Sequence, residues 1–459
     1  MGEEALERIR AARPDLLITL DNGVTAHDAV AALRADGIDT IVVDHHHIPE
    51  AGLPPAVAVV NPQREDHAYP FRELCGAGLA FKLAWALAQA FSHAQRVTPA
   101  FRAFLLDALG FAALGTVCDV VPLRGENRIL VAQGLKAVAH GRAPGLAALV
   151  GVCQLRGEPT VTDIGFLLGP RLNAAGRCAR AAEALELLLT EDPARAAELA
   201  QRLDALNAER QSIEQKILDE ARAQAAERLK AAPPPSAFVL GSAGWHQGVI
   251  GIVASRIVEE FHRPAVLLAL DEAAGTARGS GRSISGFHLA EALAAAGAHL
   301  TTYGGHAAAA GLSAPAANVE AFRAAFEAVA SAQLSPGDLQ ASLHVEEFVP
   351  LNEVTGAFCR DLERLDPCGM GNPRPVLAAQ DVRVAGQVKP MGADERHLSF
   401  FAAQAGQALR AVGFGMGEHF NKLCELGQAG SFEIAFSPVL NHFRGQTNVE
   451  LHLRAFRAG

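Results

Sequence analysis

An aspartate and three histidines follow one another at residues 44–47, immediately after the apolar and β-branched segment 40–43. Carboxylate oxygen and imidazole nitrogen atoms together are suitable ligands for a divalent transition metal. A solvated loop that is merely rich in histidine is the alternative interpretation. A second apolar segment, 16–20, ends directly in Asp21. Because open α/β sheets place their ligand sites at the carboxyl ends of parallel strands, we expect Asp21 and Asp44 to face one metal-binding crevice.

Three other segments have both a chemical and a structural interpretation. Asp119 follows a run of small residues, and its position fits a helix cap as well as it fits a metal ligand. The segment 278–286 is rich in glycine, hydroxyl groups and arginine. In the segment 303–311, His306 follows two glycines and precedes a run of alanines. Glycine lets the backbone close on a ligand and the alanines suit a tightly packed helix, although a histidine of the core is the alternative for His306.

Arginines are concentrated in the segment 162–180, where Arg171, Arg177 and Arg180 surround Asn173 and a glycine. Arginine binds phosphate in a planar, bidentate way, and glycine allows the backbone to approach an anion closely. A cluster of surface salt bridges is the alternative, and the sequence leaves both interpretations open.

The elements that must position these residues alternate between helix and strand. The predicted order is helix 3–12, strand 16–20, helix 26–35, strand 40–43 and strand 56–60, and residues 74–111 are then helical. This alternation predicts a parallel sheet built from βαβ units. A crossover helix at residue 3 is expected to arrive from a preceding strand, which the given sequence does not contain.

The remainder of the chain predicts a connector and two further folding units. A long helix from about 193 to 230 has apolar residues at coiled-coil-like spacing and is otherwise typical of a solvated connector. The prolines at 233–235 end it. A second α/β unit opens at Ser236, and from about 340 to 459 short alternating segments with glycine turns indicate a small β-barrel, an oligonucleotide-binding fold being one option.

Composition limits the class of protein. The 459 residues are 50% hydrophobic, enough to form the cores of two or three domains. Seven scattered cysteines without Cys-x-x-Cys spacing indicate neither a disulfide framework nor a zinc site. The acidic amino terminus is unlike a signal peptide, so we expect a cytoplasmic protein without a membrane segment. The net charge of -10 argues against a protein that is basic all over, but not against a local basic groove.

The motifs taken together resemble the RecJ family of single-stranded-DNA-specific 5′ exonucleases, in the DHH phosphoesterase superfamily. The matching segments are TLDNG at 19–23, VDHHHIPE at 43–50, LGTVCDVVPL at 114–123, RLNAAGR at 171–177, GWHQGVIGIVASR at 244–256, SGRSISGFHLAEAL at 280–293, YGGHAAAAGLS at 303–313 and PCGMGNPRPVL at 367–377. The resemblance covers almost the whole chain, and the combination of DHH, GGH and a C-terminal β module is specific.

The resemblance implies a role for individual residues. Asp21 would bridge two Mn²⁺ or Mg²⁺ ions, and His45 and Asp119 would complete the ligands of one ion. Asp44 would orient the site, and His46 would contact the scissile phosphate. Two such ions can activate a water and stabilise the leaving oxygen of a phosphodiester. The residues implied in binding phosphate or DNA are Arg171, Asn173, Arg177, Arg282, Ser283, Ser285 and His306, the last of which would close a cleft from the second α/β domain.

The resemblance also implies an architecture. We expect an α/β chain with a parallel-sheet DHH domain at 1–190, a connector helix at 191–235, a smaller α/β DHHA1 domain at 236–335 and an oligonucleotide-binding-like barrel at 336–459. The family carries an Asp-x-Asp pair after an earlier strand, and no such pair precedes Asp21 in the given sequence. We therefore expect this chain to be nearly inactive, yet able to bind DNA.

The expected function is metal-dependent hydrolysis of single-stranded DNA from its 5′ end, in DNA repair and recombination. The expected protein is a monomer, with a single-strand-binding protein or a helicase as further partners. Two alternatives remain open. One is another phosphodiesterase of the superfamily, acting on oligoribonucleotides or cyclic dinucleotides, although such enzymes usually lack the long connector and the β module. The other is a non-catalytic nucleic-acid-binding relative.

Overall fold

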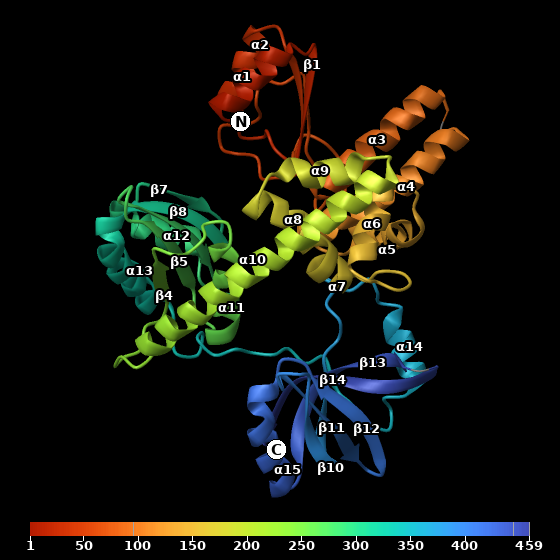
Figure 1. Cartoon of the computed structure of the whole chain (residues 1–459), viewed down its shortest axis with the longest axis vertical. Coiled ribbons are helices and arrows are strands. Elements are labelled where there is room, and N and C mark those ends of the chain that lie inside the picture. The colour runs from red at the N-terminus through yellow and green to blue at the C-terminus, as the bar shows by residue number, and fades with distance from the viewer. Residues whose placement is uncertain (95, 444, 459) are drawn as a thin grey trace. The chain divides into compact units, whose positions relative to one another are not determined.

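The computed structural model describes residues 1–94, 96–443 and 445–458 of the chain. The chain forms two compact units, which are described separately (Figure 1). The first unit comprises Met1–Val150, Gln154–Leu167 and Leu343–Gly459, and the second comprises Gly151–Cys153 and Leu168–Ser342.

The first unit begins with a parallel three-stranded sheet in the order β1-β2-β3, as the alternation of helix and strand predicted. Its elements are α1 (Glu3–Ala12), β1 (Leu16–Leu20), α2 (His27–Ala35), β2 (Asp39–Val43) and β3 (Ala58–Val60). Val30 of α2 packs with Val42 and Val59 of the central and edge strands, and all three are buried. The carboxyl ends of β1 and β2 are level, because Leu20 is the register partner of Val43. Asp21 and Asp44 therefore leave the sheet side by side.

A group of helices follows the sheet. These are α3 (Gly76–Ser92), α4 (Pro99–Cys118), α5 (Gly125–His140), α6 (Pro144–Val152), α7 (Val161–Asp163) and the π-helix η1 (Ile164–Leu168). Thr98 caps α4 by accepting a hydrogen bond from the Phe101 N–H, and Pro99 takes the first helical position. Helix α4 is long and apolar enough to cross a membrane, a test that a core helix of a soluble protein also passes. Because α4 packs against α3 and α5, we interpret it as a core helix.

The C-terminal part of the first unit is a closed barrel. Its elements are β9 (Glu347–Phe348), α14 (Gly356–Glu363), β10 (Leu377–Met391), β11 (His397–Gln404), β12 (Gln407–Gly413), η4 (Gly417–His419), α15 (Phe420–Ala429), β13 (Phe432–Phe443) and β14 (Gln446–Ala458). The strand order is β11-β12-β14-β13-β10, and β10 also pairs with β11, which closes the ring. Phe400, Phe432 and Phe436 fill the interior. The predicted barrel is confirmed, with longer strands than expected.

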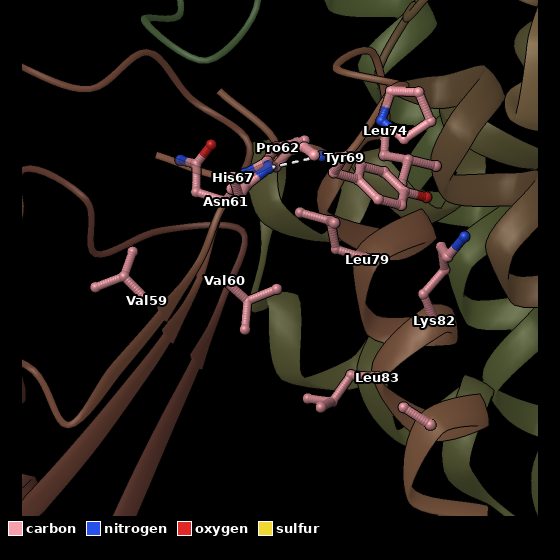
Figure 2. Close-up of a pocket in the computed structure, with 13 residues that line it drawn as sticks. Val59, Val60, Asn61, Pro62, His67, Tyr69, Leu74, Leu79, Lys82 and Leu83 are labelled. Atoms are coloured by element: carbon pink, nitrogen blue, oxygen red, sulfur yellow. Dashed lines mark hydrogen bonds between the residues drawn. The ribbon is translucent and has the colours of Figure 1, made fainter. Parts of the chain in front are cut away.

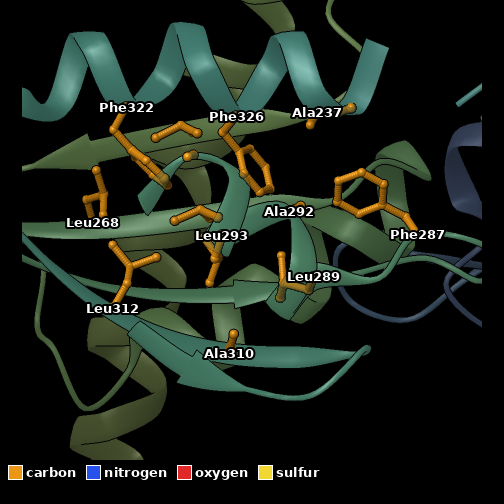
Figure 3. Close-up of a cluster of buried hydrophobic side chains, with 14 of the residues drawn as sticks. Ala237, Leu268, Phe287, Leu289, Ala292, Leu293, Ala310, Leu312, Phe322 and Phe326 are labelled. Carbon is orange, nitrogen blue, oxygen red and sulfur yellow. The ribbon is translucent and has the colours of Figure 1, made fainter. Parts of the chain in front are cut away.

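The second unit contains a mixed sheet between two layers of helices. Its elements are α8 (Gly169–Cys178), α9 (Ala181–Leu189), α10 (Pro193–Arg228), β4 (Phe238–Ser242), α11 (Ile250–Phe261), β5 (Ala265–Asp271), β6 (Thr276–Arg282), α12 (Leu289–Ala295), η2 (Gly297–His299), β7 (Thr302–Gly305), β8 (Ala309–Pro315), η3 (Ala316–Asn318) and α13 (Val319–Gln333). The strand order is β4-β5-β6-β8-β7, in which only β4 and β5 are parallel. Figure 3 shows the core on one face, where Phe322 and Phe326 of α13 meet Leu268 and Leu312.

One local prediction in this unit is wrong. The alanine run at 307–310 does not begin a helix, because residues 302–315 form the hairpin of β7 and β8. Gly305 has a φ of 149°, and a Cβ atom there would lie 2.4 Å from the Ala309 carbonyl oxygen, so the turn requires glycine. The glycine-rich segment from 278 is a strand, β6, up to Arg282.

Helix α10 differs from the predicted solvated connector. One face is buried along its length, including Leu199, Leu203 and Leu206 in the first half and Ile217 in the second. The helix packs on α8 and α9 and then on α11 and β4. The apolar spacing that resembled a coiled coil is therefore satisfied within the same unit.

Candidate active site

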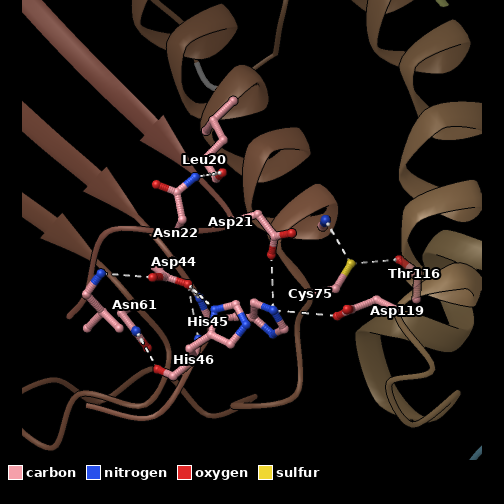
Figure 4. Close-up of polar contacts among 12 residues, drawn as sticks. Leu20, Asp21, Asn22, Asp44, His45, His46, Asn61, Cys75, Thr116 and Asp119 are labelled. Atoms are coloured by element: carbon pink, nitrogen blue, oxygen red, sulfur yellow. Dashed lines mark hydrogen bonds and ion pairs between the residues drawn. The ribbon is translucent and has the colours of Figure 1, made fainter. Parts of the chain in front are cut away.

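Three predicted ligands converge beyond the carboxyl ends of β1 and β2 (Figure 4). The Nε2 atom of His45 lies 3.1 Å from Oδ1 of Asp21 and 3.5 Å from Oδ2 of Asp119. Asp119 is the C-cap residue that follows α4, so the structure combines both interpretations of this position: it caps the helix and faces the histidine. One ligand atom each of Asp21, His45 and His46 also lie within 4.8 Å of one another.

This cluster has the properties of a cation site. The Nε2 atom of His45 is buried and makes no hydrogen bond among the described residues, although such atoms are normally satisfied. Burial raises the pKa of Asp119; the nearby His45 opposes this shift, and the neighbouring Asp21 adds to it. A divalent cation would accept the lone pair of His45 and neutralise both carboxylates. The two carboxylates suit Mn²⁺ or Mg²⁺, and the imidazole nitrogen adds a ligand of the kind that transition metals take.

Asp44 lies next to this cluster, and its carboxylate stabilises the surrounding backbone by accepting hydrogen bonds. It is 1% exposed, and its carboxylate accepts hydrogen bonds from the backbone N–H groups of Val24, at 2.9 Å, and His45, at 2.8 Å. Nδ1 of His46 lies 2.7 Å from the same carboxylate. Burial opposes ionisation, but these hydrogen bonds outweigh it and lower the pKa of Asp44. Because an ionised Asp44 orients Nδ1–H of His46 toward itself, Nε2 of this exposed ring is free to meet a ligand.

The structure adds two residues that the sequence did not reveal. Asp21 has a φ of 64°, the left-handed region, and Gly76 at the start of α3 leaves room for its carboxylate. Asn61 follows β3, is 3% exposed, and donates from Nδ2 to the His46 carbonyl oxygen at 2.9 Å. The signal for Asn61 was its position directly after a strand, as for Asp21. No local pattern marks Gly76, because its partner lies 55 residues away in the chain.

Arg177 and Arg282 form a second candidate site, within the second unit. Nη1 of Arg177 donates to the Gly248 carbonyl oxygen at 2.9 Å. Arg282 donates to the Gly281 carbonyl at 2.8 Å and to the Ser280 hydroxyl at 3.1 Å. Burial lowers the pKa of both guanidinium groups, and each is lowered further by a neighbouring arginine. Such concentration of positive charge favours binding of an anion.

A buried network on α10 lies behind Arg177. Nη1 of Arg210 pairs with Oε2 of Glu214 at 2.5 Å, and Arg210 also donates to Oδ1 of Asn207 at 3.0 and 3.2 Å. Glu214 accepts Arg256 at its other oxygen, at 2.7 Å. Arg210 is the arginine that lowers the pKa of Arg177 after burial. Two arginines, Arg210 and Arg256, share the single carboxylate of Glu214, so the network adds net positive charge beside the candidate phosphate site.

The remaining predicted residues are distributed around these sites. Arg171 pairs with Asp204 of α10 at 2.8 Å, so the salt-bridge interpretation describes this arginine. Asn173 and Ser285 are exposed. The Ser283 hydroxyl donates to the Phe287 carbonyl at 2.7 Å and stabilises the turn after β6. His306 is exposed in the turn between β7 and β8, where the Ala308 carbonyl accepts the Ser283 N–H at 3.0 Å.

An apolar cavity of about 680 Å³ lies between β3 and α3 (Figure 2). Leu74, Leu79 and Leu83 line it, and Lys82 and Tyr69 stand at its polar side. Both polar side chains are held by Glu126, at 2.5 Å from Nζ of Lys82 and 2.6 Å from the Tyr69 hydroxyl. None of the predicted site residues lines this cavity.

Comparison with known proteins accounts for most of the chain. Three family models match: the DHH family N-terminal domain over residues 2–111, the DHHA1 domain over 235–332 and the RecJ OB domain over 345–455. The chain is 35% identical over 464 residues to the single-stranded-DNA-specific exonuclease RecJ of Salmonella typhimurium, covering 98% of this chain and 78% of that protein. It is 36% identical over 418 residues to RecJ of Bacillus subtilis, of which it covers 51%. The chain thus spans about half the length of the latter relative.

Solved structures show the same similarity. The Mn²⁺ complex of RecJ from Thermus thermophilus matches with a TM-score of 0.83 and 32% identity, over 99% of this chain and 64% of that one. A manganese-bound exonuclease RecJ matches with a TM-score of 0.62 and 36% identity, over 74% of this chain and 81% of that one. In both relatives, Mn²⁺ is the ion named.

Proposed function

Because the chain belongs to the family of RecJ single-stranded-DNA-specific exonucleases, we propose that it is a metal-dependent hydrolase that removes nucleotides from the 5′ end of single-stranded DNA. The observation that carries the proposal is the convergence of the buried Nε2 atom of His45 with Oδ1 of Asp21, at 3.1 Å, and Oδ2 of Asp119, at 3.5 Å. A histidine nitrogen between two carboxylates is a ligand set for a divalent cation. Manganese or magnesium in related structures supports the choice of ion.

Different residues would have different roles in such a reaction. The ligands of a divalent cation would be Asp21, His45 and Asp119. When bound, the cation would activate a water and stabilise the charge that develops on the phosphate. Asp44 holds the loop after β2 and the ring of His46 through its hydrogen bonds. The exposed Nε2 of His46 is then placed to contact a phosphate oxygen. Gly76 keeps the position beside the Asp21 carboxylate open.

Polarity and substrate are proposed from the second unit and the barrel. Arg177 and Arg282 would bind a 5′ phosphate through hydrogen bonds. This contact would fix the register of the strand without base-specific contacts. The barrel matches the RecJ OB domain, and folds of this class hold single strands by stacking and backbone contacts. Sequence preference should therefore be slight. The other proposed contacts to the strand are Arg171, Asn173, Ser283, Ser285 and His306.

The same proposal places the protein in the cytoplasm as a monomer, with a single-strand-binding protein or a helicase as additional partners. The family's named activity on single-stranded DNA supports such partners, because single strands are exposed by unwinding and covered by binding proteins. A non-catalytic relative would also bind DNA, so turnover has to be measured separately from binding.

The test is a time course with Mn²⁺ on single strands labelled at either end and blocked in turn at the 5′ or the 3′ terminus. We expect the low residual digestion by this chain to fall on the 3′-blocked strand and the 5′-blocked strand to resist. Asp21→Asn is the matched variant, and it should abolish digestion and weaken Mn²⁺ binding measured by calorimetry. Digestion of only the 5′-blocked strand would overturn the polarity and favour the oligoribonuclease type of enzyme. Mn²⁺ binding that is the same in Asp21→Asn would overturn the metal site itself.

A further inference from the structure

Strand β6 presents two different faces. Gly279 and Gly281 lie toward the core of Figure 3, since Cβ atoms there would lie 2.7 Å from Leu268 and 3.0 Å from Leu289. Successive side chains of a strand point to opposite faces. Arg278, Ser280 and Arg282 therefore share the other face, on which α11 begins: a Cβ atom on Gly251 would meet Ser280 at 2.9 Å and Arg282 at 3.2 Å. We call Arg278, Ser280 and Arg282 the β6 stripe.

The cations of this region lack acidic partners. Among the described residues, Arg177, Arg278 and Arg282 form no ion pair, although the chain as a whole carries a net charge of -10. The hydrogen bond of the Arg278 guanidinium is a long one, 3.4 Å, to Oε1 of Gln247. An unpaired guanidinium in an acidic protein is available to an anionic ligand.

The end of the β6 stripe at Arg278 opens into a cavity of about 890 Å³. The cavity lies beyond the carboxyl ends of the parallel strands β4 and β5, the position at which open α/β sheets bind ligands. Arg278, Gln247 and His246 supply polar groups, and Asp271, Glu272 and Thr276 supply others. A ligand that suits it carries an anionic group for Arg278 and hydrogen-bond donors for the two carboxylates. A nucleotide has both.

We propose that this cavity is a second phosphate subsite for the DNA strand whose terminal phosphate is bound by Arg177 and Arg282. The inference deepens the proposed function and rests on it. Arg278 and Arg282 are four residues apart on one strand, so their Cα atoms are separated by about 13 Å at the usual rise of a β-strand. A phosphodiester further along the strand is the occupant that fits, and its sugar or base would meet Asp271.

The experiment measures binding to the whole chain without divalent cation, so that no strand is cleaved. The probes are thymidine 5′-monophosphate, the 5′-triphosphate and a 5′-phosphorylated thymidine tetranucleotide, compared by calorimetry at several salt concentrations. Arg278→Ala should lower the affinity for the tetranucleotide roughly fivefold. It should also reduce the slope of log affinity against log salt concentration by about 0.7, which corresponds to the loss of one phosphate contact. The affinity for the monophosphate should not change. Arg282→Ala should weaken all three probes.

Lys230→Ala is the matched control, because it removes one positive charge from an exposed residue of the same unit. It should leave all three affinities unchanged. An equal loss for the monophosphate and the tetranucleotide in Arg278→Ala would overturn the subsite, as would a loss confined to the triphosphate. If the wild type binds the tetranucleotide and Arg282→Ala weakens it, but Arg278→Ala does not, only this inference fails. If the wild type binds no oligonucleotide, the proposed function fails as well.

Discussion

A Cβ atom on Gly76 would lie 2.3 Å from Oδ1 of Asp21, the carboxylate that faces His45. The first residue of α3 thus has no room for a side chain beside this candidate ligand. Asp21 itself adopts the left-handed conformation, with a φ of 64°, which side chains rarely adopt without a local reason. The close approach of the two residues ties the geometry of the metal ligands to the start of a helix.

Replacing Gly76 with alanine should therefore displace Asp21 and weaken Mn²⁺ binding. We expect a loss of about tenfold or more, since residues that support metal ligands typically contribute 10- to 100-fold to affinity. Titration calorimetry with Mn²⁺ measures it. Gly151→Ala is the control, because a Cβ atom there meets nothing within 4 Å. An unchanged Mn²⁺ affinity in a folded Gly76→Ala protein would contradict this account.

Replacing Arg177 with alanine should remove most of the preference for a 5′-phosphorylated strand over a 5′-hydroxyl strand. We expect a loss of about tenfold, since a hydrogen bond to a charged group contributes about 1.5–3 kcal/mol. Mn²⁺ binding should be unchanged, because the metal ligands lie in the other unit. Arg171→Ala is the comparison: Arg171 is paired with Asp204, so the preference should fall less. Equal effects of the two variants would argue against the assignment of Arg177.

Replacing Phe401 with alanine should weaken binding of single-stranded DNA to the barrel. Phe401 is 51% exposed on β11 and lies opposite Arg410 of β12, which provides an aromatic face next to a cation. Stacking on an aromatic side chain contributes about 1–3 kcal/mol per base. Fluorescence anisotropy with labelled oligothymidine measures the change. Phe91→Ala, at an exposed position of α3, should have no effect on DNA affinity.

Replacing Glu126 with glutamine should make the stability of the protein less dependent on acid pH. Burial opposes ionisation of Glu126, but hydrogen bonds from Lys82 and Tyr69 outweigh it, so the pKa of Glu126 is lowered. A lowered folded pKa means that the stabilisation is present above the unfolded pKa, about 4.3, and is lost as pH falls below it. Burial lowers the pKa of Lys82, but the same hydrogen bonds raise it overall, so Lys82 stays charged throughout that range.

At pH 7 the free energy of unfolding of Glu126→Gln should therefore be lower by about 1 kcal/mol. The difference from the wild type should shrink as pH falls below about 4. Urea unfolding at pH 7, about 4 and about 3 measures it, with Glu65→Gln, at an exposed position, as the charge-matched control. A difference that is constant across these pH values would show that the lost hydrogen bonds, not the charge, matter.

Local patterns in the sequence predicted much of the fold and marked the candidate metal ligands. Apolar runs that end in Asp21 and Asp44 predicted two parallel strands, and the structure places those strands level in one sheet. The alternating segments after residue 340 predicted the barrel, which β10 closes by pairing with β11. These predictions succeed because strand periodicity and side-chain type are properties of a few consecutive residues.

Which distant residues meet depends on how the helices and strands pack. Gly76 lies beside Asp21, and Arg171 pairs with Asp204; neither relationship follows from local periodicity. The alanine run after His306 has a high helix propensity, but pairing of β7 with β8 overrides it. Contacts between distant segments depend on how whole elements pack. The free energy of this packing can outweigh the local preference of a segment for helix or strand, and neighbouring residues in the sequence do not reveal it.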